Sequence, residues 1–114
     1  MRSRSDGEWT VVNLHGEVDL ASAPQFRRGI YDLIDQGNHR IAVDLADVEF
    51  MDSTGLGVLI GSLKRLREAD GSMVLAGIRP SVARVFEITG LDRIFTIHGS
   101  LADIGVTAGG EGST

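Results

Sequence analysis

The sequence predicts a single α/β domain in which helices pack against a small, mixed and mostly parallel sheet. Two observations lead to this fold class. Apolar segments typical of strands alternate along the chain with amphipathic helical patterns, and 114 residues with 42% hydrophobic content suit one domain with one core. Strands separated by helices usually run parallel, because the helix returns the chain to the same end of the sheet. We expect this domain to span residues 1–104.

Two short strand candidates open the chain. Residues 9–14 (WTVVNL) are rich in β-branched residues, and His15 and Gly16 follow them as a turn signal. Residues 17–20 (EVDL) form the second candidate, which could pair with the first across that turn.

A helix is predicted next, between Ser22 and Gly37. Ser22 can cap its free N–H groups, Pro24 suits its first turn, and Gly37 ends it. Residues 41–45 (IAVDL) follow as an apolar strand, which we expect to be central. The apolar stripe of the helix consists of Phe26, Ile30, Leu33 and Ile34.

The second half repeats the alternation. A helix follows residues 50–57 (FMDSTGLG) and ends near residues 70–71. Residues 73–76 (MVLA) and 94–97 (IFTI) are strands, separated by a short helix that Pro80 opens. On a helical wheel, the core face of the longer helix consists of Leu56, Leu59, Ile60, Leu63 and Leu66.

The end of the chain differs in composition from the rest. Residues 105–114 (GVTAGGEGST) are rich in glycine and lack apolar periodicity. We expect them to form a flexible tail.

Composition excludes several classes of function. Sixteen acidic and eleven basic residues give a formal net charge of −5, which disfavours binding to nucleic acid. No apolar run approaches the roughly 20 residues that span a bilayer, and no secretory signal is visible, so a cytoplasmic protein without a membrane partner is expected. The absence of cysteine excludes disulfides and thiolate metal sites.

The glycine-rich segment at residues 50–61 does not match the catalytic motifs that it resembles. Met51 stands where a hydrolase nucleophile elbow needs glycine, and Lys64 comes too late for a phosphate-binding P-loop. The glycines also miss the dinucleotide-binding spacing by one residue, and the three histidines lack a second ligand at helical spacing. We therefore expect no enzyme activity, no cofactor and no metal. The glycines are Gly55, Gly57 and Gly61.

A hydroxyl group at the start of a helix is the feature that does fit. The first N–H groups of a helix are unpaired and favour negative charge, so a phosphate on Ser53 would be tolerated there. Glycines beside Ser53 would let a kinase or a partner approach closely. The alternative is that Ser53 merely caps the helix.

The helical wheel predicts a docking face opposite the core face. It places Val58 toward solvent, flanked by glycine gaps and by a charge; the alternative is that Val58 packs beneath a neighbouring loop. The predicted docking face consists of Gly57, Val58, Gly61 and Arg65.

Three segments together resemble a known family, the bacterial anti-sigma factor antagonists, which are single STAS domains. The segments are LHGEVDLASAP (residues 14–24), VDLADVEFMDSTGLGVLIG (residues 43–61) and GIRPSVARVFEITGLDRIF (residues 77–95). The resemblance covers residues 9–97 and implies a small sheet with its helices on one face and its first strand at an edge.

By the same resemblance, the function is partner switching. The unmodified protein would bind an anti-sigma factor that is also a serine kinase, so that the sigma factor is released. The kinase would then phosphorylate Ser53 and end the complex, and a PP2C-type phosphatase would reverse the modification. The residues implied in partner binding are Asp19, Asp52, Thr54, Gly55, Gly57, Val58, Gly61 and Arg65.

A rival function within the same family is a STAS scaffold subunit of a lipid-transport or stress-sensing complex. The intact serine of DSTGLG favours the regulatory function. The chain also departs from the family pattern, because a glycine-rich tail replaces the longer final helix, and this puts any contact made by that helix in doubt.

Overall fold

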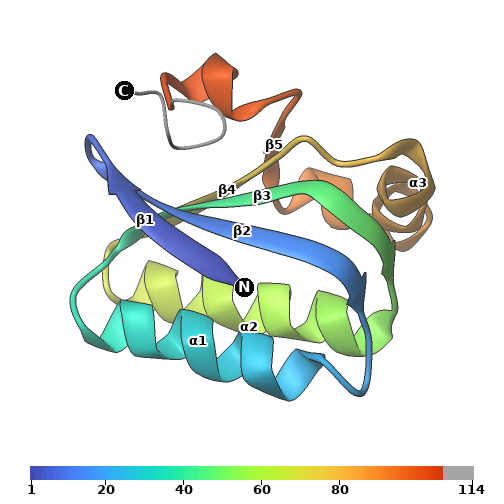
Figure 1. Cartoon of the computed structure of the whole chain (residues 1–114), viewed down its shortest axis with the longest axis horizontal. Helices are drawn as coiled ribbons and strands as arrows, with labels where there is room; N and C mark the ends of the chain where they lie inside the picture. Colours follow the sequence, from blue (N-terminus) through green and yellow to red (C-terminus); the bar gives the residue numbers. More distant parts are fainter. Residues whose placement is uncertain (107–114) are drawn as a thin grey trace.

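The computed structural model, which describes residues 1–106, contains one five-stranded sheet in the order β1-β2-β3-β4-β5. Strand β1 is antiparallel to β2, and the remaining neighbours are parallel, which confirms the predicted mixed, mostly parallel sheet (Figure 1). The elements are β1 (Arg2–Asp6), β2 (Trp9–Val18), α1 (Ala23–Asp35), β3 (Arg40–Met51), α2 (Ser53–Glu68), β4 (Ser72–Ala76), α3 (Pro80–Thr89), β5 (Thr96–His98) and the 3₁₀ helices η1 (Leu91–Arg93) and η2 (Leu101–Ile104).

The hairpin predicted around His15 and Gly16 is wrong. Strand β2 runs without interruption through both residues, and its pairing with β3 shifts register on either side of them. Gly16 has φ +76°, so the glycine allows an irregularity inside the strand rather than a turn. Some turns and some β-bulges both use a glycine with positive φ, and for this reason the sequence signal was ambiguous.

The observed hairpin joins β1 to β2 instead. Asp6 pairs with Trp9 across a connection of Gly7 and Glu8, and Gly7 has φ +60°. The segment RSRSD of β1 contains no apolar residue, so it carries no strand pattern that the sequence could reveal. It lies at the edge of the sheet.

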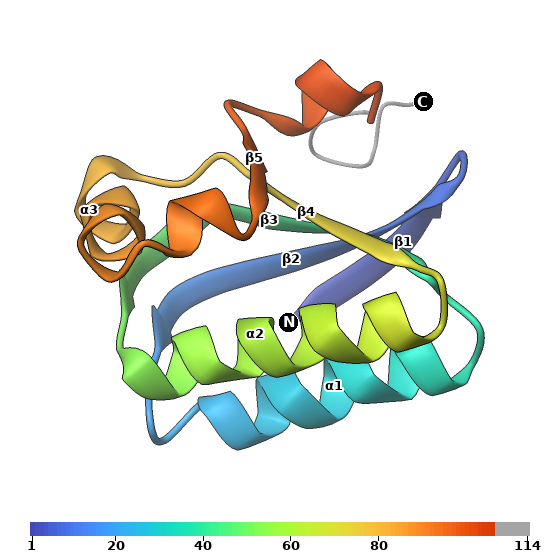
Figure 2. The same cartoon turned by 180° about the vertical axis from the view of Figure 1, so that it is seen from behind.

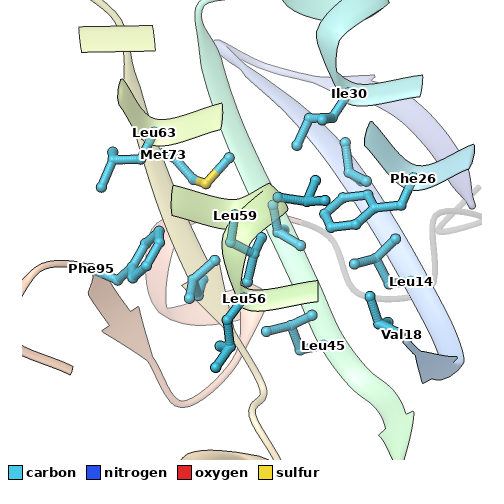
Figure 3. Packing of buried hydrophobic residues seen from close by; sticks show 14 of the residues in the cluster. Leu14, Val18, Phe26, Ile30, Leu45, Leu56, Leu59, Leu63, Met73 and Phe95 are labelled. Carbon is cyan, nitrogen blue, oxygen red and sulfur yellow. The ribbon is translucent and has the colours of Figure 1, made fainter. Parts of the chain in front are cut away.

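The main core lies between the sheet and the three α-helices. Helices α1 and α2 lie side by side along one face, and α3 packs near the far end of β3 (Figures 1 and 2). The close view shows leucine, phenylalanine and methionine side chains of the helices and strands meeting in this layer (Figure 3). No helix in residues 1–106 is long and apolar enough to cross a membrane.

The opposite face of the sheet is covered by the end of the described chain. Leu101 of η2 and Val106 pack there against Val11, Ala42 and Val74, and Val106 is only 3% exposed. Residues 105 and 106 of the predicted tail are therefore part of the packed structure, and residues 107–114 lie outside the part that the structure describes. This second layer explains why β4 and the first half of β3 are buried on both faces.

Candidate functional site

The site forms where two neighbouring strands end. Val18 of β2 and Met51 of β3 are paired, and the Asp52 N–H donates to the Val18 carbonyl oxygen at 3.2 Å. Beyond this point the two segments separate: β2 continues into the loop before α1, and β3 continues into α2. Because parallel strands finish at the same edge of a sheet, both entry segments and the start of α2 share one end of the molecule.

Asp52 is the N-cap residue of α2. Its Oδ1 accepts the N–H groups of Thr54 at 2.9 Å and Gly55 at 3.1 Å. Its Oδ2 accepts the Leu20 N–H at 3.2 Å, which ties the loop before α1 to the start of α2. Two of the free N–H groups at this helix start are therefore already bound to a carboxylate, so the cap is Asp52 and not Ser53.

Ser53 is the first residue of α2 and is exposed. Within residues 1–106, its hydroxyl group makes no hydrogen bond to the protein, and the neighbouring Thr54 is half-buried. The geometry presents one unengaged hydroxyl group to an incoming reactant.

Asp19 organises the loop before α1. Its Oδ1 accepts the N–H groups of Ala21 at 3.0 Å and Ser22 at 3.1 Å. Ser22 makes no side-chain cap bond to α1; its hydroxyl donates to the Glu17 carbonyl oxygen at 2.8 Å, so the predicted Ser22 cap is wrong. Asp19 is joined to the Ser53 segment through the loop, since the next residue, Leu20, donates to Asp52.

Gly55 is buried because the chain crosses closely at this position. A Cβ atom here would lie 2.7 Å from the Val18 carbonyl oxygen and 2.9 Å from Met51 Cγ. No side chain fits in this space, so Gly55 serves the packing of α2 against the end of β2 and does not form part of an exposed docking surface. Gly57, by contrast, is exposed, and a Cβ atom there would meet nothing within 4 Å.

The helical wheel predicts most of the core face of α2 correctly, since Leu56, Leu59, Leu63 and Leu66 are buried, but it reverses two positions. Val58 is buried, with 7% exposure, and belongs to the main core, whereas Ile60 is 40% exposed. The reason is the position of α1, which covers the flank of α2 that carries Val58. Hydropathy alone could not reveal which flank a neighbouring helix would cover.

Gly61 and Arg65 face the same neighbour. A Cβ atom on Gly61 would lie 2.7 Å from the Tyr31 hydroxyl oxygen, and the Arg65 guanidinium lies 4.5 Å from the centre of the Tyr31 ring. Arg65 also pairs with Asp35 at 3.4 Å. Both residues therefore contact α1, although Arg65 remains exposed. Within the predicted docking face, Gly57 is the glycine at which an added Cβ atom would meet nothing.

Three exposed apolar side chains near the site or along α2 were not predicted to be functional. Leu20 is 74% exposed beside Asp52, Phe50 is 51% exposed near the end of β3, and Ile60 lies two helical turns beyond Ser53. The heptad spacing from Ser53 to Ile60 could have shown that both share one helix face. In residues 1–106, no group of three or more His, Asp or Glu side chains could hold a metal ion.

The comparisons with known proteins identify the family and agree with the fold. The STAS domain family model matches residues 2–104. The chain is 42% identical over 86 residues to the anti-sigma-B factor antagonist of Bacillus subtilis, a match covering 75% of this chain and 78% of that protein.

Solved structures with the same fold include two relatives. The Bacillus cell fate determinant SpoIIAA in its phosphorylated form has a TM-score of 0.72 and 27% identity, over 90% of this chain and 94% of that one. An anti-sigma factor antagonist from Mycobacterium paratuberculosis has a TM-score of 0.82 and 26% identity, over 90% of this chain and 86% of that one.

Proposed function

Since the chain belongs to the STAS domain family, we propose that it is an anti-sigma factor antagonist whose binding is switched off by phosphorylation of Ser53. The observation that carries the proposal is the exposed Ser53 hydroxyl group, which stands free at the start of α2 beside a carboxylate that already caps the helix. The related SpoIIAA has a phosphorylated form, and the B. subtilis relative is named for antagonism of an anti-sigma factor. Such a regulator acts in the cytoplasm, where sigma factors work.

The unmodified protein binds its anti-sigma factor through the end of the molecule that carries Ser53. Hydrogen bonds to Asp19 fix the loop before α1, and the Asp52 carboxylate fixes the helix start by accepting the Thr54 N–H. Gly57 leaves the helix surface flat for a partner backbone. While the anti-sigma factor is held in this complex, the sigma factor is released. The chain acts as a binding partner and as a kinase substrate, and it performs no catalysis of its own.

Phosphorylation reverses this state. The partner is itself a serine kinase: the Ser53 oxygen attacks the γ-phosphorus of ATP, the bond to the β-phosphate breaks, ADP leaves and the hydroxyl proton passes to a base of the kinase. A PP2C-type phosphatase removes the group by hydrolysis. The protein is thereby returned to its binding form.

The switch acts at the interface rather than through refolding. A phosphoserine adds about −1.5 to −2 charges at neutral pH, and in a closed interface this charge must lose water beside Asp52. A loss of about 2.8 kcal/mol lowers affinity roughly a hundredfold. One buried dianion without a cationic partner is sufficient for a change of that size.

The experiment incubates the chain with the anti-sigma kinase of the same organism and ATP, and maps the product by mass spectrometry. We expect one phosphate on Ser53 and none on Ser53→Ala. Ser53→Ala should still bind the kinase, whereas Ser53→Asp should bind weakly with unchanged circular dichroism. A phosphate on another residue, or unfolding of Ser53→Asp, contradicts the proposal; co-purification with a membrane permease favours the scaffold function.

A further inference from the structure

An apolar hollow lies on the flank of α2 that α1 does not cover. It has a volume of about 400 Å³. Ile60 and Ile94 are 40% and 46% exposed, so its walls place large apolar groups in water. A large apolar side chain of another molecule would remove this apolar surface from water. The hollow is lined by Ile60, Leu63, Lys64, Arg67, Glu68 and Ile94.

Positive charge borders this hollow in a chain that is otherwise acidic. Lys64 and Arg67 form no salt bridge within residues 1–106; the Arg67 guanidinium only reaches the Ile94 carbonyl oxygen, at 3.5 Å. Glu68 is the one carboxylate in the lining, which leaves a net positive charge here, against −5 for the whole chain. A ligand that suits the hollow is therefore apolar at its centre and negative at its edge.

The hollow lies on the same helix face as Ser53. Ser53, Gly57, Ile60, Lys64 and Arg67 are all exposed, and their spacing of four and three residues places them in one row. The helix rises about 1.5 Å per residue. Along its axis, Ile60 therefore lies about 10 Å and Lys64 about 16 Å from Ser53. A partner helix laid along α2 can touch Ser53 at one end and the hollow at the other.

We propose that this hollow anchors an acidic amphipathic helix of the anti-sigma factor. An apolar side chain of that helix fills the space between Ile60 and Ile94, and a neighbouring Asp or Glu pairs with Lys64 or Arg67. This contact presupposes the proposed function, because it is made with the same partner at a second point. A second copy of this chain is a poorer occupant, since a symmetric contact would bring Lys64 and Arg67 against their own copies.

The anchor and the phosphorylation site act independently. The distance of about 16 Å from Ser53 to Lys64 is twice the Debye length of about 8 Å at physiological salt, so Lys64 does not neutralise a phosphate on Ser53. The hollow therefore supplies affinity, whereas Ser53 decides when binding is allowed. Substitutions at the two places should have additive effects on the free energy of binding.

The experiment measures the affinity of the purified anti-sigma factor, without ATP, for Ile60→Ser and Lys64→Glu. Each variant should bind about tenfold more weakly than the unaltered chain, because each loses one anchor contact. Lys64→Glu should also show a weaker dependence on salt. The matched controls Ile88→Ser, which alters a residue 77% exposed on α3, and Arg28→Glu, which alters an exposed residue on α1, should bind as the unaltered chain does.

The possible results distinguish failure of the anchoring hollow from failure of the Ser53 switch. If the unaltered chain binds and Ser53→Asp does not, but Ile60→Ser and Lys64→Glu bind like the controls, the anchor is refuted and the switch stands. If the unaltered chain does not bind the anti-sigma factor, both are refuted. Self-association of the chain in sedimentation, abolished by Ile60→Ser, would assign the hollow to a second copy and overturn the proposal.

Discussion

Replacing Gly55 by alanine should destabilise the domain although alanine is the better helix former. The added Cβ would lie 2.7 Å from the Val18 carbonyl oxygen, 2.8 Å from Val18 Cγ1 and 2.9 Å from Met51 Cγ. The carbonyl oxygen cannot move freely, because it accepts the Asp52 N–H that joins β2 to the start of α2. The helix must therefore shift away from the sheet.

The magnitude follows from two opposing terms. Overpacking costs about 1–3 kcal/mol, and a contact with fixed backbone belongs at the upper end, whereas alanine gains about 1 kcal/mol over glycine in a helix. Gly55→Ala should therefore lower the free energy of unfolding by about 2 kcal/mol. Gly57→Ala is the matched control on the same helix: its Cβ meets nothing within 4 Å. That variant should gain about 1 kcal/mol.

Urea and thermal unfolding followed by circular dichroism will measure this difference. About 3 kcal/mol between the variants corresponds to melting temperatures about 12 °C apart for a domain of this size. Equal stabilities for Gly55→Ala and Gly57→Ala would refute the reasoning. Gly55 would then be needed for access to Ser53 and not for packing.

Three further substitutions test the site. Asp52→Ala should lower stability by about 2 kcal/mol in urea unfolding, since two helix N–H groups and the Leu20 N–H lose their acceptor; an unchanged midpoint would show that the cap is dispensable. Val58→Glu should lower the free energy of unfolding by at least about 3 kcal/mol, because it buries a charge. A variant with native stability would show that Val58 is exposed to solvent. Arg65→Ala should lower the free energy of unfolding by less than about 1 kcal/mol and leave the affinity for the anti-sigma factor unchanged. A large loss of affinity would show that Arg65 contacts the partner.

The fold class could be predicted because the pattern of helices and strands is strongly periodic. The parallel strands, α3 and its end at Gly90 follow from apolar spacing and glycine placement. Strand β1 could not be predicted, because it is held by backbone pairing at an edge and carries no apolar residue. The burial of Val106 was missed for a related reason: one valine among glycines gives no periodicity, although the open face of the sheet can accept it.

The position of the candidate site at the start of α2 was predictable, but the orientation of its helix was predictable only in part. The sequence alone indicates a hydroxyl group next to an aspartate at the start of a helix, and the structure places Ser53 and Asp52 there. The sequence placed Ile60 in the core and Val58 in solvent, and the structure reverses the two, because both are apolar and the packing of α1 decides which one is buried. The role of Gly55 also depended on a tertiary contact, with Val18, that lies far away in the sequence.

The most direct test is one titration of the anti-sigma factor with two samples of the unaltered chain, one unmodified and one phosphorylated on Ser53. We expect the phosphorylated sample to bind at least about a hundredfold more weakly, a difference of about 2.8 kcal/mol, with the same circular dichroism spectrum. Equal affinity of the two samples, or a phosphorylated sample that has lost its fold, would contradict the claim that a charge on Ser53 closes the interface.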